Sequence, residues 1–269
     1  MATKLQLLRP ARPLVAALLA LVAFRPAPGP STRQTREVAA FAEVQLSTSV
    51  TVVVRQGSPQ QVVVEAASED LPKLQTEVVA GKLRIERVRP GTHGGLLSGW
   101  DDKASQLAGP ATVYVTLPTV RGLAVSSSGR LEAESIEGQR VRLAVSGSGQ
   151  LRVAQLQAAQ VRASLSSSGQ VAVQQLRADT LEASVSGSGS LVAAGTCAYS
   201  DLGLSSSGRL DATSLAVQSC QARLSGSGSC LVNVARTLDA RLSGSGSLLV
   251  SGNPQINSRV SGSGRVRQR

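Results

Sequence analysis

Aromatic and histidine side chains are the scarcest features of this sequence. Phenylalanine, tyrosine and tryptophan together make up 2% of the 269 residues, and His93 is the single histidine. Proteins that hold single-stranded nucleic acid stack its bases on aromatic rings, so we expect no nucleic-acid partner despite a net charge of +11. A single histidine excludes histidine clusters, and we expect no metal and no cofactor.

Cysteine is also rare. The three cysteines, Cys197, Cys220 and Cys230, show no metal-ligand spacing. An odd number in an exported protein leaves at least one thiol unpaired. The strand alternation described below places Cys220 and Cys230 on the inner face, where cysteine behaves as a small buried hydrophobe.

Long apolar runs are limited to the N-terminus. The run LVAALLALVAF at 14–24 follows Lys4, Arg9 and Arg12 and precedes the breaker PAPGP. It is too short to span a membrane, and its basic flank is typical of a secretory signal peptide over residues 1–30. A frayed apolar N-terminus is the alternative. We expect an exported protein, periplasmic or at the cell surface, with no transmembrane segment after signal removal.

Acidic residues are fewer than basic ones. Residues 1–30 hold four of the 28 Lys and Arg and none of the 17 Asp and Glu, so residues 31–269 carry 24 basic against 17 acidic side chains, a net charge of +7. This balance favours acidic partners such as acidic polysaccharide, lipopolysaccharide or other anionic cell-surface components.

What the sequence contains in abundance is one tetrapeptide, SSSG or SGSG, which occurs eight times between residues 126 and 264. Its last glycine recurs every 18–20 residues. A fixed period of this length is the signature of a solenoid, in which each repeat buries its apolar face against its neighbours. The eight register glycines are Gly129, Gly149, Gly169, Gly189, Gly208, Gly228, Gly246 and Gly264.

Apolar and polar residues alternate around each register glycine. The residue four before it is apolar in every copy, as at Val145 and Leu165, whereas neighbours such as Gln150 are polar. This period of two predicts strands with one buried face. The glycine falls on the inner face at a corner, where we expect only tiny residues to fit. A second break near Ile136 gives three short faces per coil. We predict an all-β fold, a single-stranded right-handed parallel β-helix (solenoid) with 18–20-residue coils.

We expect residues 31–269 to form a single β-helical domain. The eight SxSG repeats occupy residues 119–266, and the strand signals of 37–118 predict opening coils and a cap, with a hairpin-like or coil-turning unit at 78–88. A solenoid needs an atypical terminal unit to cover its core.

Several motifs in this order are similar to a known family. RxVxxF from Arg36 to Phe41, VxVxxG ending at Gly57, VxVEA ending at Ala66, GKLRI at 81–85, VTLP at 115–118 and the reiterated VSGSG resemble the head GIN domain family. The resemblance covers nearly all of the chain after residue 30 and implies an exported bacterial β-helical protein of the auto-transporter adhesin type. The chain ends five residues after the last SGSG, so we expect no translocator segment to follow.

Catalytic candidates are few. His93 lies near Asp101 and Asp102 in a glycine-rich stretch that we interpret as a solvated loop. Glycosidases on β-helices need clustered carboxylates, and here the acidic residues occupy different columns or distant coils. We list them as Glu132, Glu134, Glu182, Asp201, Asp211 and Asp239. We expect no catalytic residue and no enzyme activity.

Two outward columns are candidates for binding. Serines on either side of the corner, such as Ser126 and Ser128, form hydroxyl ladders, which we interpret as corner chemistry in preference to a sugar- or ice-binding surface. Five residues before the register glycine stand Arg223, Arg241 and Arg259 in the last three coils. They are candidate ligands for an anionic polymer, or equally a charged guard against aggregation of the open last coil.

We therefore predict an exported, non-enzymatic β-helical protein for cell-surface adhesion or for interaction with a polyanion or glycan. The alternatives are a polysaccharide-processing enzyme on a β-helix and an ice- or glycan-binding rod.

Overall fold

The computed structural model describes residues 31–88 and 106–269. The predicted signal peptide at 1–30 lies outside the described residues, as do His93, Trp100, Asp101 and Asp102. Within the described ranges, no helix is both long and apolar enough to cross a membrane.

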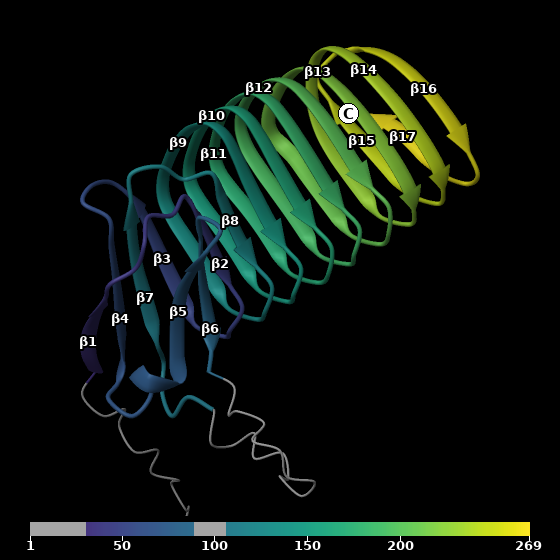
Figure 1. Ribbon diagram of the computed structural model, residues 1–269. Helices are drawn as coiled ribbons and strands as arrows, with labels where there is room; N and C mark the ends of the chain where they lie inside the picture. The colour runs from purple at the N-terminus through teal and green to yellow at the C-terminus, as the bar shows by residue number, and fades with distance from the viewer. Residues whose placement is uncertain (1–30, 89–105) are drawn as a thin grey trace, which may run out of the picture.

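The described strands join into one 17-stranded sheet that winds into an elongated rod (Figure 1). Six long strands form the repeats, and each pairs in parallel with the next. The predicted parallel β-solenoid is confirmed. These strands are β9 (Arg130–Val145), β10 (Gln150–Leu165), β11 (Gln170–Val185), β12 (Ser190–Leu204), β13 (Arg209–Gly226) and β14 (Ser229–Gly244).

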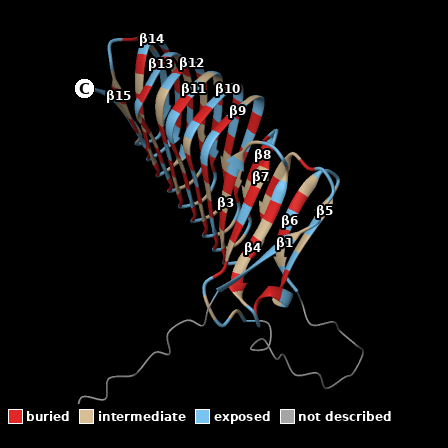
Figure 2. Cartoon of the chain, turned by 90° about the vertical axis from the view of Figure 1, so that its left-hand side faces the viewer, coloured by how far each residue is buried: buried red, intermediate tan, exposed pale blue. Residues whose placement is uncertain are grey.

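Each long strand bends where the inward–outward alternation slips. In β9 the pairs Glu134–Ser135 and Gln139–Arg140 are consecutive residues without a buried side chain between them. Buried residues resume at Ile136 and again at Val141. With the SxSG corner these two bends give each coil three sides, and the buried residues form bands that recur from coil to coil (Figure 2).

Identical positions of successive repeats lie directly above one another. Leu165 is the register partner of Val145 in the preceding coil and of Val185 in the following one. Each of these three side chains is 1% exposed. Because a coil is too thin to bury apolar side chains alone, these columns make one continuous core along the rod.

The corner glycines stand where the backbones of neighbouring coils come closest. A Cβ added to Gly169 would lie 2.5 Å from the Gly149 carbonyl oxygen and 2.6 Å from Val145 Cγ1. That carbonyl accepts a hydrogen bond of 2.9 Å from the Gln170 amide, so it cannot retreat without breaking the ladder. The corresponding gaps are 2.4–2.7 Å in the first six corners, and they widen to 2.9 Å at Gly246 and 3.0 Å at Gly264.

A shorter coil is accommodated by one further glycine. Gly195 stands at φ +124°, opposite Leu176 and Leu215, where β12 shifts register against both neighbours. An added Cβ would meet the Leu176 carbonyl oxygen at 2.1 Å. The coil from Gly189 to Gly208 is one residue shorter than its neighbours. The difference is taken up at the bend around Gly195, so the SxSG corners stay aligned.

The opening of the rod mixes parallel and antiparallel pairing. The strand β2 pairs in parallel with β6 and β8, and β3 pairs in parallel with β7 and β9. The strands β5 and β6 form a hairpin over residues 74–87, which begins before the predicted unit at 78–88, while β4 lies antiparallel to β7 and β1. The bounds are β1 (Ser31–Arg36), β2 (Glu43–Leu46), β3 (Thr51–Gln56), β4 (Gln61–Ala67), the 3₁₀ turn η1 (Leu71–Lys73), β5 (Leu74–Val79), β6 (Lys82–Arg87), β7 (Thr112–Leu117) and β8 (Gly122–Val125). The antiparallel pairs of β4 were not anticipated, because an alternating pattern is the same for either direction of pairing.

The far end is formed by three shorter strands. They are β15 (Ser247–Ser251), β16 (Gln255–Ser261) and β17 (Arg265–Gln268), with β16 paired to β14 and β17 paired to β15.

A buried carboxylate holds the opening together. Asp70 is fully buried and accepts hydrogen bonds from Lys73 Nζ at 2.8 Å and from the amides of Ala108 and Gly109 at 2.8 and 3.1 Å. Burial raises the pKa of the Asp70 carboxyl, but these bonds outweigh it, so the pKa lies below its usual value. Asp70 thereby ties η1 to the segment that leads into β7.

The first prediction tests the register. Leu165→Asp places an unpaired charge in the core and should lower the free energy of unfolding by more than about 3 kcal/mol. Gln170→Asp changes an exposed residue of the next strand, so its cost should stay within about 0.5 kcal/mol. Urea unfolding followed by circular dichroism measures both, and equal losses would contradict the assigned faces.

The second prediction tests the corner. Gly169→Ala should cost about 3 kcal/mol, because its Cβ has no room against the Gly149 carbonyl. The matched control Ser168→Ala changes the exposed neighbour in the same tetrapeptide and should change stability by less than about 0.5 kcal/mol. Thermal unfolding midpoints decide between the two, and a larger shift for the serine variant would refute the corner's steric role.

Candidate functional site

The candidate site lies on the side of the rod that precedes the SxSG corner, which we call the pre-corner side. It contains the ends of the long strands, for example residues 141–145 of β9. Position five before the register glycine faces outward there, because the residues on either side of it are buried in all coils but the last. In the last coil, Arg259 is the register partner of the outward Arg241. Along the rod this column contains Ala124, Ala144, Ser164, Ser184, Gly203, Arg223, Arg241 and Arg259.

The three arginines of this column, which we call the arginine column, stack in register. Arg223 is the partner of Arg241, and Arg241 is the partner of Arg259. Neighbouring strands lie about 4.8 Å apart, so the three guanidinium groups form a short row parallel to the rod axis. All three residues are exposed.

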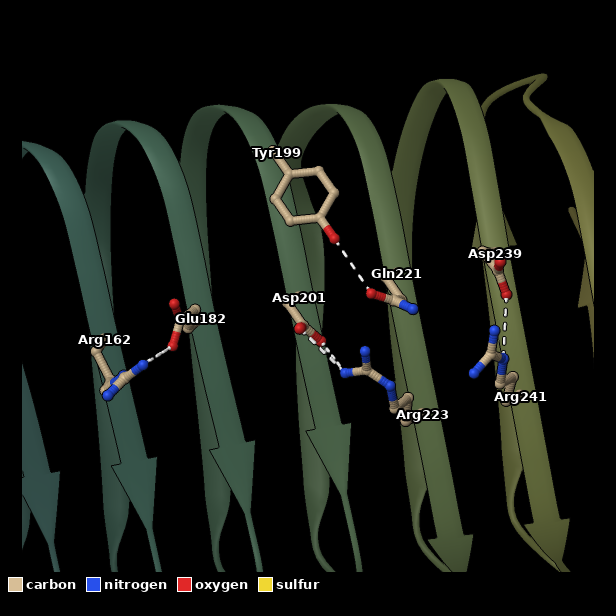
Figure 3. A network of polar contacts seen from close by, with 8 residues as sticks. All are labelled: Arg162, Glu182, Tyr199, Asp201, Gln221, Arg223, Asp239 and Arg241. Atoms are coloured by element: carbon tan, nitrogen blue, oxygen red, sulfur yellow. Dashed lines mark hydrogen bonds and ion pairs between the residues drawn. The ribbon is translucent and has the colours of Figure 1, made fainter.

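Two carboxylates are interleaved with this row (Figure 3). Arg223 Nη1 donates to both oxygens of Asp201, at 2.7 and 3.0 Å, and this bond raises the pKa of Arg223. Arg241 Nε lies 3.7 Å from Asp239 Oδ1. Within residues 31–88 and 106–269, no carboxylate oxygen lies within 4.0 Å of the Arg259 guanidinium. Two of the three positive charges of the arginine column are therefore paired with a carboxylate. Alignment of the repeats shows the three arginines but not this pairing.

A groove of about 560 Å³ runs beside the arginine column. One wall is the arginine column and the other is the serine column at Ser205, Ser225 and Ser243. Leu204, Leu224 and Leu242 also line it, but they are only 2–4% exposed because their side chains point into the core. Val260, another lining residue, is 45% exposed, so the accessible lining combines guanidinium groups, hydroxyls and backbone with an apolar part at the last coil.

Gly203 leaves a gap in this column one coil before Arg223. It interrupts the column between Ser184 and Arg223. A Cβ added there would meet only the Ala183 carbonyl oxygen, at 3.9 Å. Packing therefore does not require glycine at this position, in contrast to the corners.

The sequence analysis did not connect three neighbouring residues, Asp201, Asp239 and Tyr199, with the arginine column. Asp201 stands one coil before Arg223 and two positions earlier, and Asp239 precedes Arg241 by two, so alignment of the repeats contained both signals. Tyr199 is 39% exposed, and its hydroxyl donates to Gln221 Oε1 at 3.2 Å (Figure 3). An aromatic residue at an outward position of so aromatic-poor a chain was the available signal.

Two of the acidic residues considered as catalytic candidates stand in one column, because Glu182 is the register partner of Asp201 in the next coil. The expectation that the six occupy different columns or distant coils is therefore wrong for this pair. Each of the six lies within 4.0 Å of an arginine: Glu132 of Arg130, Glu134 of Arg55, Glu182 of Arg162, Asp201 of Arg223, Asp211 of Arg209 and Asp239 of Arg241. Among the described residues, no group of three or more His, Cys, Asp or Glu is arranged to hold a metal ion.

The serine hydroxyls at the first corner bond to neighbouring backbone. Ser127 Oγ donates to the Thr48 carbonyl at 2.7 Å, and Ser126 Oγ donates to the Leu46 carbonyl at 3.3 Å. These bonds link the first SxSG corner to the opening coil, as expected of corner chemistry.

The three cysteine thiols are buried in the core. Cys197, Cys220 and Cys230 are 1–4% exposed and are not joined in disulfides. Burial raises the pKa of Cys220 to about 11, and it raises the pKa of Cys230 still further. Because the thiolate is the reactive form, these cysteines are packing residues and poor nucleophiles.

The chain matches a protein-family model. Residues 40–174 and 155–254 match the model described as "Putative auto-transporter adhesin, head GIN domain". The comparison with curated proteins gives no match.

Solved structures of low sequence identity share the fold. A "putative lipid binding protein" from Parabacteroides distasonis is 18% identical, with 90% of this chain and 97% of that chain covered and a TM-score of 0.79. A "putative adhesin" from the same organism is 21% identical, with 90% and 98% covered and a TM-score of 0.74. A "putative adhesin" from Parabacteroides merdae is 16% identical, with 90% and 97% covered and a TM-score of 0.76.

The third prediction concerns Cys220. Its folded-state pKa is raised, so the folded protein holds the neutral thiol while the unfolded chain ionises near pH 8.5–9. Stability should be unaffected by this group below that pH and should fall between about pH 9 and about pH 11, by about 1.4 kcal/mol per pH unit. Cys220→Ala should flatten this decline in urea titrations. Identical slopes for the two proteins would contradict the burial argument.

Proposed function

This chain belongs to the family "Putative auto-transporter adhesin, head GIN domain", and from that premise we propose that it is an exported, non-enzymatic adhesin-like rod that binds a linear acidic polysaccharide of a cell surface. The observation that carries the proposal is the arginine column, stacked in register along an open groove.

The geometry suits a polymer that runs along the rod. The arginine column repeats at the strand spacing of about 4.8 Å, parallel to the groove. Guanidinium groups pair bidentately with carboxylates and are weakly hydrated, so they recognise uronate carboxylates well. The serines of the opposite wall add hydroxyls that can bond to sugar hydroxyls.

Asp201 and Asp239 compete with a bound anion for the arginines but do not block access to them. The pairs Arg223–Asp201 and Arg241–Asp239 are exposed, and such pairs contribute only about 0–1 kcal/mol. A polyanion can therefore replace Asp201 or Asp239 at little cost, and Arg259 is available without exchange. We expect weak, salt-sensitive binding in which many contacts add up along the polymer.

An acyl chain fits the groove less well. A lipid tail needs a run of exposed apolar side chains, whereas Leu204, Leu224 and Leu242 are buried beneath the groove and the exposed apolar side chain of its lining is Val260, at the last coil. The "putative lipid binding protein" shares the fold at 18% identity, which does not carry a ligand to this chain. Lipopolysaccharide would be recognised here through its anionic saccharide portion.

The enzyme alternative has less support. A glycosidase needs two carboxyl groups flanking one bond. Glu182 and Asp201 are register partners on adjacent coils, but each is paired with an arginine, Glu182 with Arg162 and Asp201 with Arg223. Export to the periplasm or cell surface is supported by the signal-like residues 1–30.

The fourth prediction tests the arginine column. The purified protein should bind immobilised polygalacturonate and not neutral dextran, with affinity falling at least about fivefold between about 50 and about 300 mM NaCl. Replacing Arg223, Arg241 and Arg259 together by Ser should weaken binding at least about tenfold, a loss of about 1.4 kcal/mol. Surface plasmon resonance measures the affinity, and circular dichroism verifies the fold.

Two controls sharpen this test. Replacing Arg130, Arg152 and Arg209 by Ser removes the same charge from outward positions after the corner and should leave most of the binding intact. Gly203→Glu should weaken binding by placing a carboxylate beside Arg223, whereas Gly203→Ser copies Ser184 of the preceding coil and should bind normally. Equal losses in both triple variants would reject the site in favour of nonspecific charge. Aggregation of the column variant without loss of binding would identify the arginines as edge protection.

A further inference from the structure

A second groove lies on the pre-corner side, at the opposite end of the repeats. Its volume is about 680 Å³, within the ~300–1,000 Å³ range of small-ligand sites. Arg121, Arg140, Arg142 and Arg162 line it, together with Gln160 and Thr180. We call it the first-coil groove.

The backbone holds its arginines in fixed relative positions. Arg140 and Arg142 lie on either side of Val141, which is 2% exposed, so both side chains face outward from β9. Arg121 stands in the preceding coil, where its amide donates to the Ala42 carbonyl at 2.7 Å and its carbonyl accepts from the Arg142 amide at 2.9 Å. Three guanidinium groups from two adjacent coils thus border one hollow.

Two glycines lie in or beside this groove, and Gly122 is buried with the Glu43 side chain against it. Gly122 is the register partner of Arg142, so the position one coil before Arg142 carries no side chain. Gly138, another lining residue, stands next to the bend that precedes Arg140. Added Cβ atoms at Gly122 and Gly138 would first meet the Glu43 side chain and Val141 Cγ2, each at 3.4 Å.

The charges of this groove are less compensated than those of the arginine column. Glu43 and Glu182 are its only acidic lining residues. Glu43 pairs with Lys82 Nζ at 3.3 Å, and Glu182 pairs with Arg162. In the part of the chain that the structure describes, no carboxylate oxygen lies within 4.0 Å of the guanidinium of Arg121, Arg140 or Arg142.

We propose that the first-coil groove is a separate binding site for a short acidic oligosaccharide, with Arg121, Arg140 and Arg142 holding its carboxylates and Gln160 and Thr180 bonding to its hydroxyls. A ligand that pairs with all three guanidinium groups needs more than one anionic group within the length of the groove. A uronate oligomer meets this requirement because it has one carboxylate per sugar. This inference does not depend on the arginine column. The two sites share one side of the rod, with Arg142 four coils, about 19 Å, before Arg223.

The fifth prediction uses trigalacturonate as the probe. Isothermal titration calorimetry on the purified full chain should detect binding of the trimer and no binding of neutral maltotriose. The variant Arg121→Ser/Arg140→Ser/Arg142→Ser should weaken trimer binding at least tenfold. All three side chains are exposed, so the unfolding midpoint should stay unchanged.

Two further variants separate this site from the arginine column. Arg121→Lys/Arg140→Lys/Arg142→Lys keeps the charge but loses the bidentate geometry, and it should weaken binding about threefold to tenfold. The variant that replaces Arg223, Arg241 and Arg259 by Ser should bind the trimer as the unaltered protein does, although its affinity for the polymer is weakened. Absence of trimer binding, undiminished binding by the first-coil Ser variant, or equal loss in both Ser variants would each overturn the proposal.

Discussion

The close approach of successive backbones at the SxSG corner is the constraint on which the rest of the rod depends. From Gly149 to Gly246, each coil turns there with the corner glycine against a carbonyl oxygen of a glycine one coil earlier, at a distance that leaves no room for a Cβ. Gly129 meets the Thr48 carbonyl oxygen in the same way. The carbonyl of the earlier register glycine also accepts the ladder bond that starts the next strand. Steric fit and hydrogen bonding thus act on the same atom, and together they hold the coils in register.

Because the register is strict, every outward position becomes a column along the rod. A residue type repeated at one position produces a stripe, as with the serines beside the corner, and a change of residue type produces a boundary. The column five before the register glycine is small from Ala124 to Gly203 and becomes arginine from Arg223 onward. The residue types exposed on the pre-corner side therefore change from coil to coil along the rod axis.

The charges on this side are arranged as local pairs within a basic background. Arg162 and Glu182, Arg223 and Asp201, and Arg241 and Asp239 each pair within one coil or between adjacent coils (Figure 3). Exposed pairs of this kind add little to stability, but they set where unpaired guanidinium groups remain. Those lie towards the two ends of the repeats, at the first-coil groove and at Arg259. A linear anion aligned with the rod has the geometry to meet both.

The sequence by itself determined the solenoid, its period and its inner face, because an 18–20-residue repeat with period-two alternation leaves no other way to bury Val145, Leu165 and their equivalents. It also placed the arginines of the last three coils on one outward column. Only the tertiary structure decided the antiparallel pairing of β4 with β1 and β7, since alternation carries no strand direction, and the buried Asp70 that fastens the opening. Alignment of the repeats placed Asp201 near Arg223, but only the tertiary structure showed their ion pair and joined Arg121 to Arg140 and Arg142, because contacts between coils depend on the exact register and on side-chain placement.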